Sequence, residues 1–336
     1  MHPDSPAPPS SRSAEDIRSE IMQLVEEYAR VAHLRAAETS ALPSTQSGTR
    51  AELTMLPGTV YARYGLPLDY LPSRDYRPRW GRTHPPIASL HEWFGSHTPK
   101  YAAFLEEMTR SLPWVETLPH DFSDSQLPEP AWFGVPFAPF DALALYTMVR
   151  LHRPRTYLEI GSGISTCFVA KAIRDHDVGT RIISIDPQPR RAIDSICNEV
   201  IREGLEVCDL ARFGELEAGD ILFFDGSHPS FMNSDVTVFM IDILPRLRTG
   251  VIVHVHDISL PWDYPEMFTD WYWNEQYLLA AYMIGARERL DPVLPTRFVC
   301  KDERFAKHLA RPFIDFGDPH RNSGWRGGGS MWFTHI

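Results

Sequence analysis

The second half of the chain alternates short apolar runs with longer amphipathic stretches. Short apolar runs are typical of strands buried on both faces of a parallel sheet, whereas apolar residues at three- and four-residue steps indicate helices. The pattern predicts strands at 157–160, 181–186, 205–207, 220–225, 250–257, 297–300 and 330–336, and helices at 140–151, 190–203, 235–247 and 268–284. This alternation predicts an α/β fold, a doubly wound, mostly parallel seven-stranded sheet with ligands at the carboxyl ends of its strands.

The first 139 residues follow a different pattern. Residues 1–12 are rich in Pro and Ser and are expected to be disordered, and an amphipathic helix is expected at 14–37, packed on the body or in a homo-oligomer contact. Residues 57–139 are dense in prolines and aromatics, with one clear helix at 99–112. We therefore expect an N-terminal extension over 1–56, a cap or substrate-facing region over 57–139, and the ligand-binding domain over 140–336.

The composition of the chain argues against several classes of function. The net charge of −11 argues against nucleic acid as the main partner, because no basic excess is available to neutralise phosphates. No apolar run reaches the roughly 20 residues that a membrane span needs, and the start has no apolar core of a secretory signal. The four cysteines show no C-x-x-C pairing, so we expect reduced thiols in a cytoplasmic protein.

A glycine turn follows the strand at 157–160 and opens a helix. Such a turn lets backbone approach a nucleotide-type ligand. A dinucleotide needs a third glycine where this chain has Thr166, and Glu159 suits a cationic ligand better than a pyrophosphate. Asp186, ending the next strand, suits a ribose. Together these features fit S-adenosylmethionine, and the candidate cofactor-binding residues are Glu159, Gly161, Ser162, Gly163, Thr166, Asp186 and Asp209.

Further acidic residues follow other strands of the expected sheet. Asp209 follows the expected third strand, where it suits either an adenine contact or a helix cap. Asp225 and Asp257 end two adjacent strands, and with His256 they are candidate ligands for one divalent metal, Mg, Mn or Fe. His228 lies just past Asp225, close enough to be a general base. The alternative is that these residues are caps and turn formers.

Several segments together resemble one enzyme class. They are Glu159–Thr166, Ile185–Pro187, Phe224–His228, Ser234–Val236 and His254–Asp257. The run from Tyr157 to Ala281 resembles class I S-adenosylmethionine-dependent methyltransferases, in the group of the macrolide-sugar O-methyltransferases and the cephalosporin-hydroxylase-like proteins. The resemblance implies the Rossmann-like methyltransferase fold, Asp225 and Asp257 as metal ligands and His228 as base. At His256 those relatives carry a carboxylate.

The resulting hypothesis is metal-assisted O-methylation of a small hydroxylated, secondary-metabolite-like acceptor in a biosynthetic reaction. Aromatic residues after the strand at 250–257 suit an acceptor pocket, although a plain aromatic core explains them equally well. The candidate substrate residues are Trp262, Tyr264, Tyr272, Asn274 and Gln276. A basic cluster (Arg74, Arg77, Arg79 and Arg82) suits an anionic substrate group or, as the simpler interpretation, a solvated loop.

Three other functions are consistent with this architecture. A nicotinamide-dependent dehydrogenase would need the third glycine and a hydride-site pair. A metal-dependent iron hydroxylase would use His228, His256 and a carboxylate, and a non-catalytic binding subunit would keep the pocket without the chemistry. The acceptor atom, oxygen, nitrogen or carbon, is not fixed by these residues.

Overall fold

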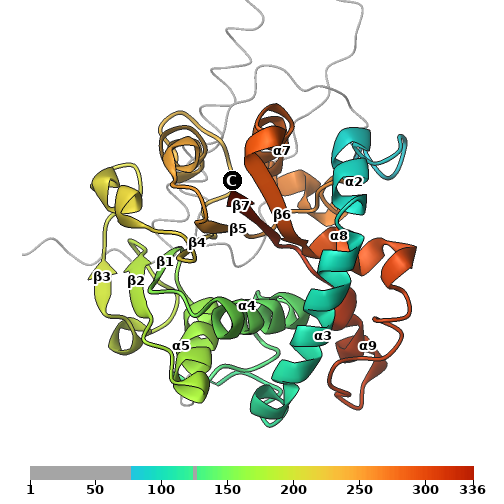
Figure 1. Cartoon of the computed structure of the whole chain (residues 1–336), viewed down its shortest axis with the longest axis horizontal. Coiled ribbons are helices and arrows are strands. Elements are labelled where there is room, and N and C mark those ends of the chain that lie inside the picture. The colour runs from blue at the N-terminus through green and yellow to red at the C-terminus, as the bar shows by residue number, and fades with distance from the viewer. Residues whose placement is uncertain (1–76, 124–126) are drawn as a thin grey trace, which may run out of the picture. The chain divides into compact units, whose positions relative to one another are not determined.

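A seven-stranded sheet forms the centre of the molecule (Figure 1). The computed structural model describes residues 77–123 and 127–336, so the expected helix at 14–37 and the linker after it lie outside the described residues. The strands are β1 Thr156–Ile160, β2 Arg181–Ile185, β3 Glu199–Ile201, β4 Ile221–Phe224, β5 Ile252–Val255, β6 Leu290–Pro295 and β7 Met331–His335. Their order is β3-β2-β1-β4-β5-β7-β6, and β7 runs antiparallel to both of its neighbours. The predicted α/β class and doubly wound, mostly parallel sheet are confirmed.

Helices cover the sheet and carry most of the remaining core. The α-helices are α2 Ala88–Gly95, α3 Thr98–Val115, α4 Pro139–His152, α5 Ile164–His176, α6 Asp235–Val238, α7 Glu275–Gly285, α8 Thr296–Lys301 and α9 Pro319–Asn322. Helix α4 is buried along almost its whole length, between α3 and α5. The described part of the cap region packs on this domain, since α3 contacts α4 and β6 and α2 contacts α7. The domain boundaries themselves stay predictions. Within the described residues, no helix has both the length and the apolar character of a membrane span.

The predicted helix at 190–203 is wrong. The chain forms one 3-10 turn, Asp194–Ile196, and then enters β3, because the segment pairs with β2 instead. Asn198 begins this pairing: its N–H bonds the Ile182 carbonyl, and its side-chain oxygen accepts from the Ile182 N–H. Helical spacing of apolar residues coincided here with β-branched residues, which a strand accepts equally well. The strand predicted at 205–207 is wrong for the same reason, because its position in the sheet is taken by β3.

The strand predicted at 297–300 is also wrong, because that segment belongs to helix α8. The strand of this region is β6, which contains Pro292 and Pro295. Proline is tolerated there because β6 is the edge strand of the sheet, and the register shifts between Pro292 and Leu294. The sequence pattern did not predict this strand, because prolines are uncommon in strands.

Two other predicted helices occur with altered geometry. The segment predicted at 235–247 begins as α6, continues as a π-helical turn, Phe239–Ile243, and ends in a 3-10 turn that contains Pro245. The segment predicted at 268–284 is a 3-10 turn, Glu266–Trp271, followed by α7. The break between them coincides with Tyr272, whose φ is +54°. All four cysteines are free, as expected.

Candidate functional site

The carboxyl ends of β1 and β4 approach each other most closely at Gly161. This residue has φ of +79°, and a Cβ added to it would lie 1.8 Å from the backbone oxygen of Asp225. The Gly161 N–H bonds the Ile185 carbonyl at 3.0 Å, which ties the turn to β2 as well. Only glycine allows both the left-handed conformation and this contact. The expected glycine turn therefore lies where three strands end together.

Asp186 lies against this turn. Its carboxylate accepts from the Ser162 N–H at 2.9 Å and from the Gln188 N–H at 2.8 Å. The hydroxyl oxygens of Ser162 and Ser184 are 2.6 Å apart beneath it. The structure thus brings Asp186 and Ser162 together at the cofactor edge of the sheet, and their contact with a cofactor stays a prediction.

Glu159 lies beneath the glycine turn and is fully buried. The hydroxyls of Ser165 and Thr166 donate to its carboxylate, and the Thr166 oxygen also accepts from the Gly163 N–H at 3.1 Å. Burial raises the pKa of Glu159 to about 8, although the two hydroxyl donors act in the opposite direction. Thr166, which stands where a dinucleotide fold has a third glycine, links the acid to the turn.

Asp209 begins the 3-10 turn Leu210–Glu215 and accepts from the Ala211 N–H at 2.9 Å. This is the capping role that the sequence left as one of two alternatives. Its contact with an adenine ring stays a prediction.

Asp225, His228 and Asp257 form a compact group at the ends of β4 and β5. One potential ligand atom from each residue lies within 4.8 Å of the others. His228 and Asp257 both have positive φ, +76° and +52°, which is uncommon for residues with a Cβ and is typical of functional sites. Burial raises the pKa of Asp225, and the nearby Asp257 raises it further, against the lowering effect of His256 and His228. Excess negative charge at such a group favours a cation.

A buried carboxylate that the sequence did not single out orients His228. The Nδ1 of His228 lies 2.6 Å from an Oε1 of Glu275, which is 1% exposed, and its Nε2 lies 3.8 Å from an Oδ2 of Asp257. Burial alone would lower the pKa of His228, but Glu275 and the two aspartates raise it to about 9. Burial raises the pKa of Glu275 to about 7. Between pH 7 and pH 9, His228 and Glu275 therefore form an ion pair, and the other ring nitrogen of His228, Nε2, faces Asp257.

His256 lies beside the group rather than in it. Its Nδ1 is 3.2 Å from the Ser330 hydroxyl and its Nε2 is 3.8 Å from Asp257. It belongs to a buried polar cluster with Asp141, whose carboxylate accepts from the Gly329 N–H at 2.8 Å. The structure therefore brings His228, and not the expected His256, into the group with the two carboxylates. Asp141 comes from α4, about 115 residues earlier in the chain, and no local signal indicated it.

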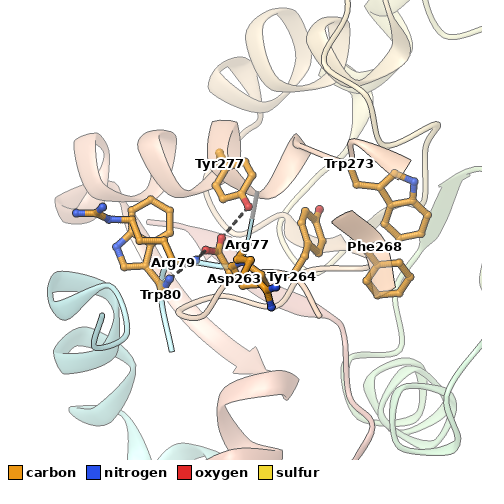
Figure 2. A pocket seen from close by; sticks show the side chains of 9 residues that line it. Arg77, Arg79, Trp80, Asp263, Tyr264, Phe268, Trp273 and Tyr277 are labelled. Carbon is orange, nitrogen blue, oxygen red and sulfur yellow. Dashed lines mark hydrogen bonds between the residues drawn. The ribbon is translucent and has the colours of Figure 1, made fainter. Parts of the chain in front are cut away.

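An aromatic cavity of about 240 Å³ lies next to His228. Figure 2 shows that it is formed between the segment 77–80 and residues of 263–277. Its lining residues are Arg77, Pro78, Arg79, Trp80, Asp263, Tyr264, Phe268, Trp273 and Tyr277. The indole of Trp273 stacks on the His228 imidazole, with ring centroids 3.7 Å apart. The cavity and the candidate base therefore share a wall.

The substrate residues predicted from sequence lie in different surroundings. Tyr264 lines the cavity, whereas Trp262 packs on Phe298 and Tyr272 lies on the surface, 42% exposed. Asn274 accepts from the Ser230 N–H at 2.6 Å and thereby holds the loop that carries His228. Gln276 is fully buried and accepts from the Ser259 N–H at 3.0 Å. Both amides tie loops together, and their contact with a substrate stays a prediction.

Comparison with known proteins identifies the domain. Residues 158–258 match a family model described as a methyltransferase domain. Among solved structures, the chain is similar to the SAH-bound methyltransferase PaMTH1 of Podospora anserina, with 16% identity and a TM-score of 0.34 over 60% of this chain and 91% of that one. It is also similar to an O-methyltransferase from Bacillus cereus in complex with SAH, with 20% identity and a TM-score of 0.33 over 56% of this chain and 82% of that one. No curated protein matches. The methyltransferase domain is therefore assigned to residues 158–258, which are less than half of the chain.

Proposed function

We propose that this chain is an S-adenosylmethionine-dependent methyltransferase that methylates a hydroxyl of a small acceptor with the help of a divalent metal. The match of residues 158–258 to a methyltransferase domain supports the first part. The observation that carries the proposal is the group of Asp225, His228 and Asp257, with Glu275 behind it. A hydroxyl is a weak nucleophile at neutral pH and needs a group that removes its proton. This group provides such a base next to the glycine turn.

The charges around the turn support a cationic donor. Glu159 lies beneath the turn, linked to Gly163 through Thr166, and the backbone carbonyl of Asp225 faces Gly161 from β4. S-adenosylmethionine carries a sulfonium and an ammonium, and a cation bound at the turn would favour the charged form of Glu159, whose pKa is about 8 without it. A pyrophosphate would instead meet an acidic group, so the site suits the cationic donor better. Asp186, at the end of β2, is the residue that we expect to accept the ribose hydroxyls.

The donor set at the centre fits a hard divalent metal. Asp225 and Asp257 supply oxygen atoms, and magnesium and manganese prefer such ligands. An ion held by these two carboxylates would lower the pKa of an acceptor hydroxyl. An iron hydroxylase of the usual kind needs two histidines and one carboxylate, whereas the described residues bring one histidine to two carboxylates, so the methyltransferase assignment is favoured.

His228 acts as the base in this proposal. Glu275 holds the Nδ1–H, so the Nε2 is the atom that takes the acceptor proton once it is itself unprotonated. Trp273 fixes the plane of the imidazole by stacking. Methyl transfer from a bound sulfonium to the oxygen would be an in-line displacement, and the chain would contribute alignment of the two groups and exclusion of water.

Binding experiments test the metal and the base separately. We expect Asp225→Asn and Asp257→Asn each to weaken Mn²⁺ binding more than about tenfold, measured by electron paramagnetic resonance, with S-adenosylhomocysteine affinity by calorimetry unchanged. Asp242→Asn, at an exposed carboxylate paired with Arg246, is the matched control. Wild-type protein that binds S-adenosylhomocysteine but no Mn²⁺ would refute the metal. Loss of Mn²⁺ binding in His228→Ala would make His228 a ligand instead of the base.

A further inference from the structure

One arginine of the aromatic cavity has no acidic partner within the part of the chain that the structure describes. The segment 77–82 carries three arginines, and two of them, Arg77 and Arg82, form ion pairs with Glu266. Arg79 pairs with no carboxylate among the described residues, and its guanidinium lies 5.9 Å from the centre of the Trp80 ring. Arg79 lines the cavity at its Trp80 end, and Figure 2 shows its side chain extending past the Trp80 ring, on the side away from Trp273.

The carboxylate that lines the cavity already accepts several hydrogen bonds. Asp263 accepts from the backbone N–H groups of Arg79 and Trp80 and from the Tyr277 hydroxyl, the last at 2.7 Å. Three hydrogen bonds to one carboxylate leave it little capacity for a ligand, and they fix the segment of Arg79 against α7. Counting only residues 77–123 and 127–336, the carboxylates bonded to the segment 77–82 are Asp263 and Glu266, against its three arginines.

The walls of the cavity are aromatic. Trp273 is stacked between His228 and Phe268, with a centroid distance of 4.6 Å to the latter, and Tyr264 meets it edge-on. A volume of about 240 Å³ lies below the roughly 300–1,000 Å³ of sites for drug-sized molecules, so the cavity suits about one ring. Because both faces of Trp273 are covered, a bound ring would meet it edge-on, an arrangement that aromatic pairs favour.

We propose that this cavity binds an aromatic ring that carries an anionic group, and that Arg79 recognises the anion. Guanidinium groups form charge-assisted, bidentate hydrogen bonds with carboxylates. The proposal rests on the proposed function in one respect: the bound ring is taken to belong to the methyl acceptor, since Trp273 separates the cavity from His228 by a single ring. Binding of the anion itself depends on neither cofactor nor metal.

A cationic ligand is the main competing occupant, since aromatic cages with a carboxylate bind ammonium groups. The hydrogen bonds of Asp263 argue against it, because both oxygens already accept from this chain. Arg79 at the same cavity would also repel a second cation.

Calorimetry with three ligands of one shape tests the proposal without cofactor or metal. The probes are para-hydroxybenzoate, para-hydroxybenzamide and para-hydroxybenzylamine, which are anionic, neutral and cationic. We expect the benzoate to bind at least about fivefold more tightly than the amide, a modest factor because Arg79 is exposed. Arg79→Gln should remove this preference, while the matched Arg82→Gln, at an arginine that Glu266 engages, should keep it.

Every other outcome overturns the proposal. Equal affinity for benzoate and amide, preference for the amine, or no binding at millimolar concentration would each show that the cavity does not select an aromatic anion. Persistence of the preference in Arg79→Gln would place the recognition elsewhere. Circular dichroism and the melting temperature of both variants check that the Asp263 hydrogen bonds, which use backbone N–H groups, are retained. Loss of Mn²⁺ or S-adenosylhomocysteine binding would concern the proposed function and leave this result unaffected.

Discussion

Glu159 provides a sharp test of the electrostatics beneath the glycine turn. Burial raises its pKa from an ordinary 4.5 to about 8 in the folded protein. A carboxyl group with a raised folded-state pKa stabilises the fold fully below pH 4.5, and this contribution is lost as the pH rises to about 8, because the unfolded chain releases the proton first. The perturbation we choose is Glu159→Gln, which keeps the size and one acceptor oxygen but cannot ionise.

The raised pKa of Glu159 corresponds to a loss of about 5 kcal/mol in the free energy of unfolding between low and high pH. Between pH 5 and pH 8 the loss is at most about 4 kcal/mol. The side chain is 0% exposed, so solvent screening takes little from this figure. Loss of one hydrogen bond from Ser165 or Thr166 costs the variant about 1 kcal/mol at every pH. We therefore expect Glu159→Gln to be close to wild type at pH 5 and more stable at pH 8.

Urea denaturation of the cofactor-free protein at several pH values measures this difference. Glu288→Gln, at an exposed carboxyl on the surface, is the control and should follow wild type throughout. A stability difference between Glu159→Gln and wild type that stays constant from pH 5 to pH 8 would show that the folded protein does not hold Glu159 uncharged. If Glu159→Gln became less stable than wild type as the pH rises, the pKa of Glu159 in the folded protein would be lowered rather than raised.

Two further substitutions test the turn and the base. Gly161→Ala should lower the free energy of unfolding in urea by more than about 3 kcal/mol, because Gly161 has φ of +79° and its added Cβ would lie 1.8 Å from the Asp225 oxygen. Gly163→Ala is the control and should keep its stability, because Gly163 has φ of −178° and no atom lies within 4 Å of an added Cβ. Equal losses in the two variants would contradict the close approach of β1 and β4. Glu275→Gln removes the charge that raises the pKa of His228 to about 9, so the rise of kcat/KM with pH should move to lower pH; an unmoved limb would show that His228 is not the group that must lose a proton.

The centre of the sheet could be predicted because its signals are local. The apolar run before Gly161, the turn and α5 are consecutive in the chain, and the strand-ending positions of Asp186, Asp225 and Asp257 follow from the same pattern. Carboxyl ends of parallel strands share one edge, so these residues had to come together. The group of Asp225, His228 and Asp257 is thus a consequence of topology that the sequence already contained.

The errors arose where long-range pairing decided the structure. Whether residues 199–201 form a strand depends on the free edge of β2, and whether Pro292 is tolerated depends on β6 being an edge strand; neither fact is visible locally. The role of His256 as a metal ligand stays a prediction: its Nδ1 lies against Ser330, which comes from a distant part of the chain, and its Nε2 lies 3.8 Å from Asp257. Glu275 was overlooked because only the fold brings α7 against the loop of His228.

The basic cluster shows how the fold gives different roles to similar residues. Arg77, Arg79 and Arg82 are alike in sequence, and a solvated loop was the simpler interpretation. Glu266 pairs with two of them, and Asp263 holds the backbone of the third, Arg79, which lines the aromatic cavity. The distinction depends on two acidic residues more than 180 positions later in the chain. If Arg79 binds the anionic group of an acceptor, its substitution should change which acceptor binds. Substitution of Arg82 should remove only an exposed ion pair.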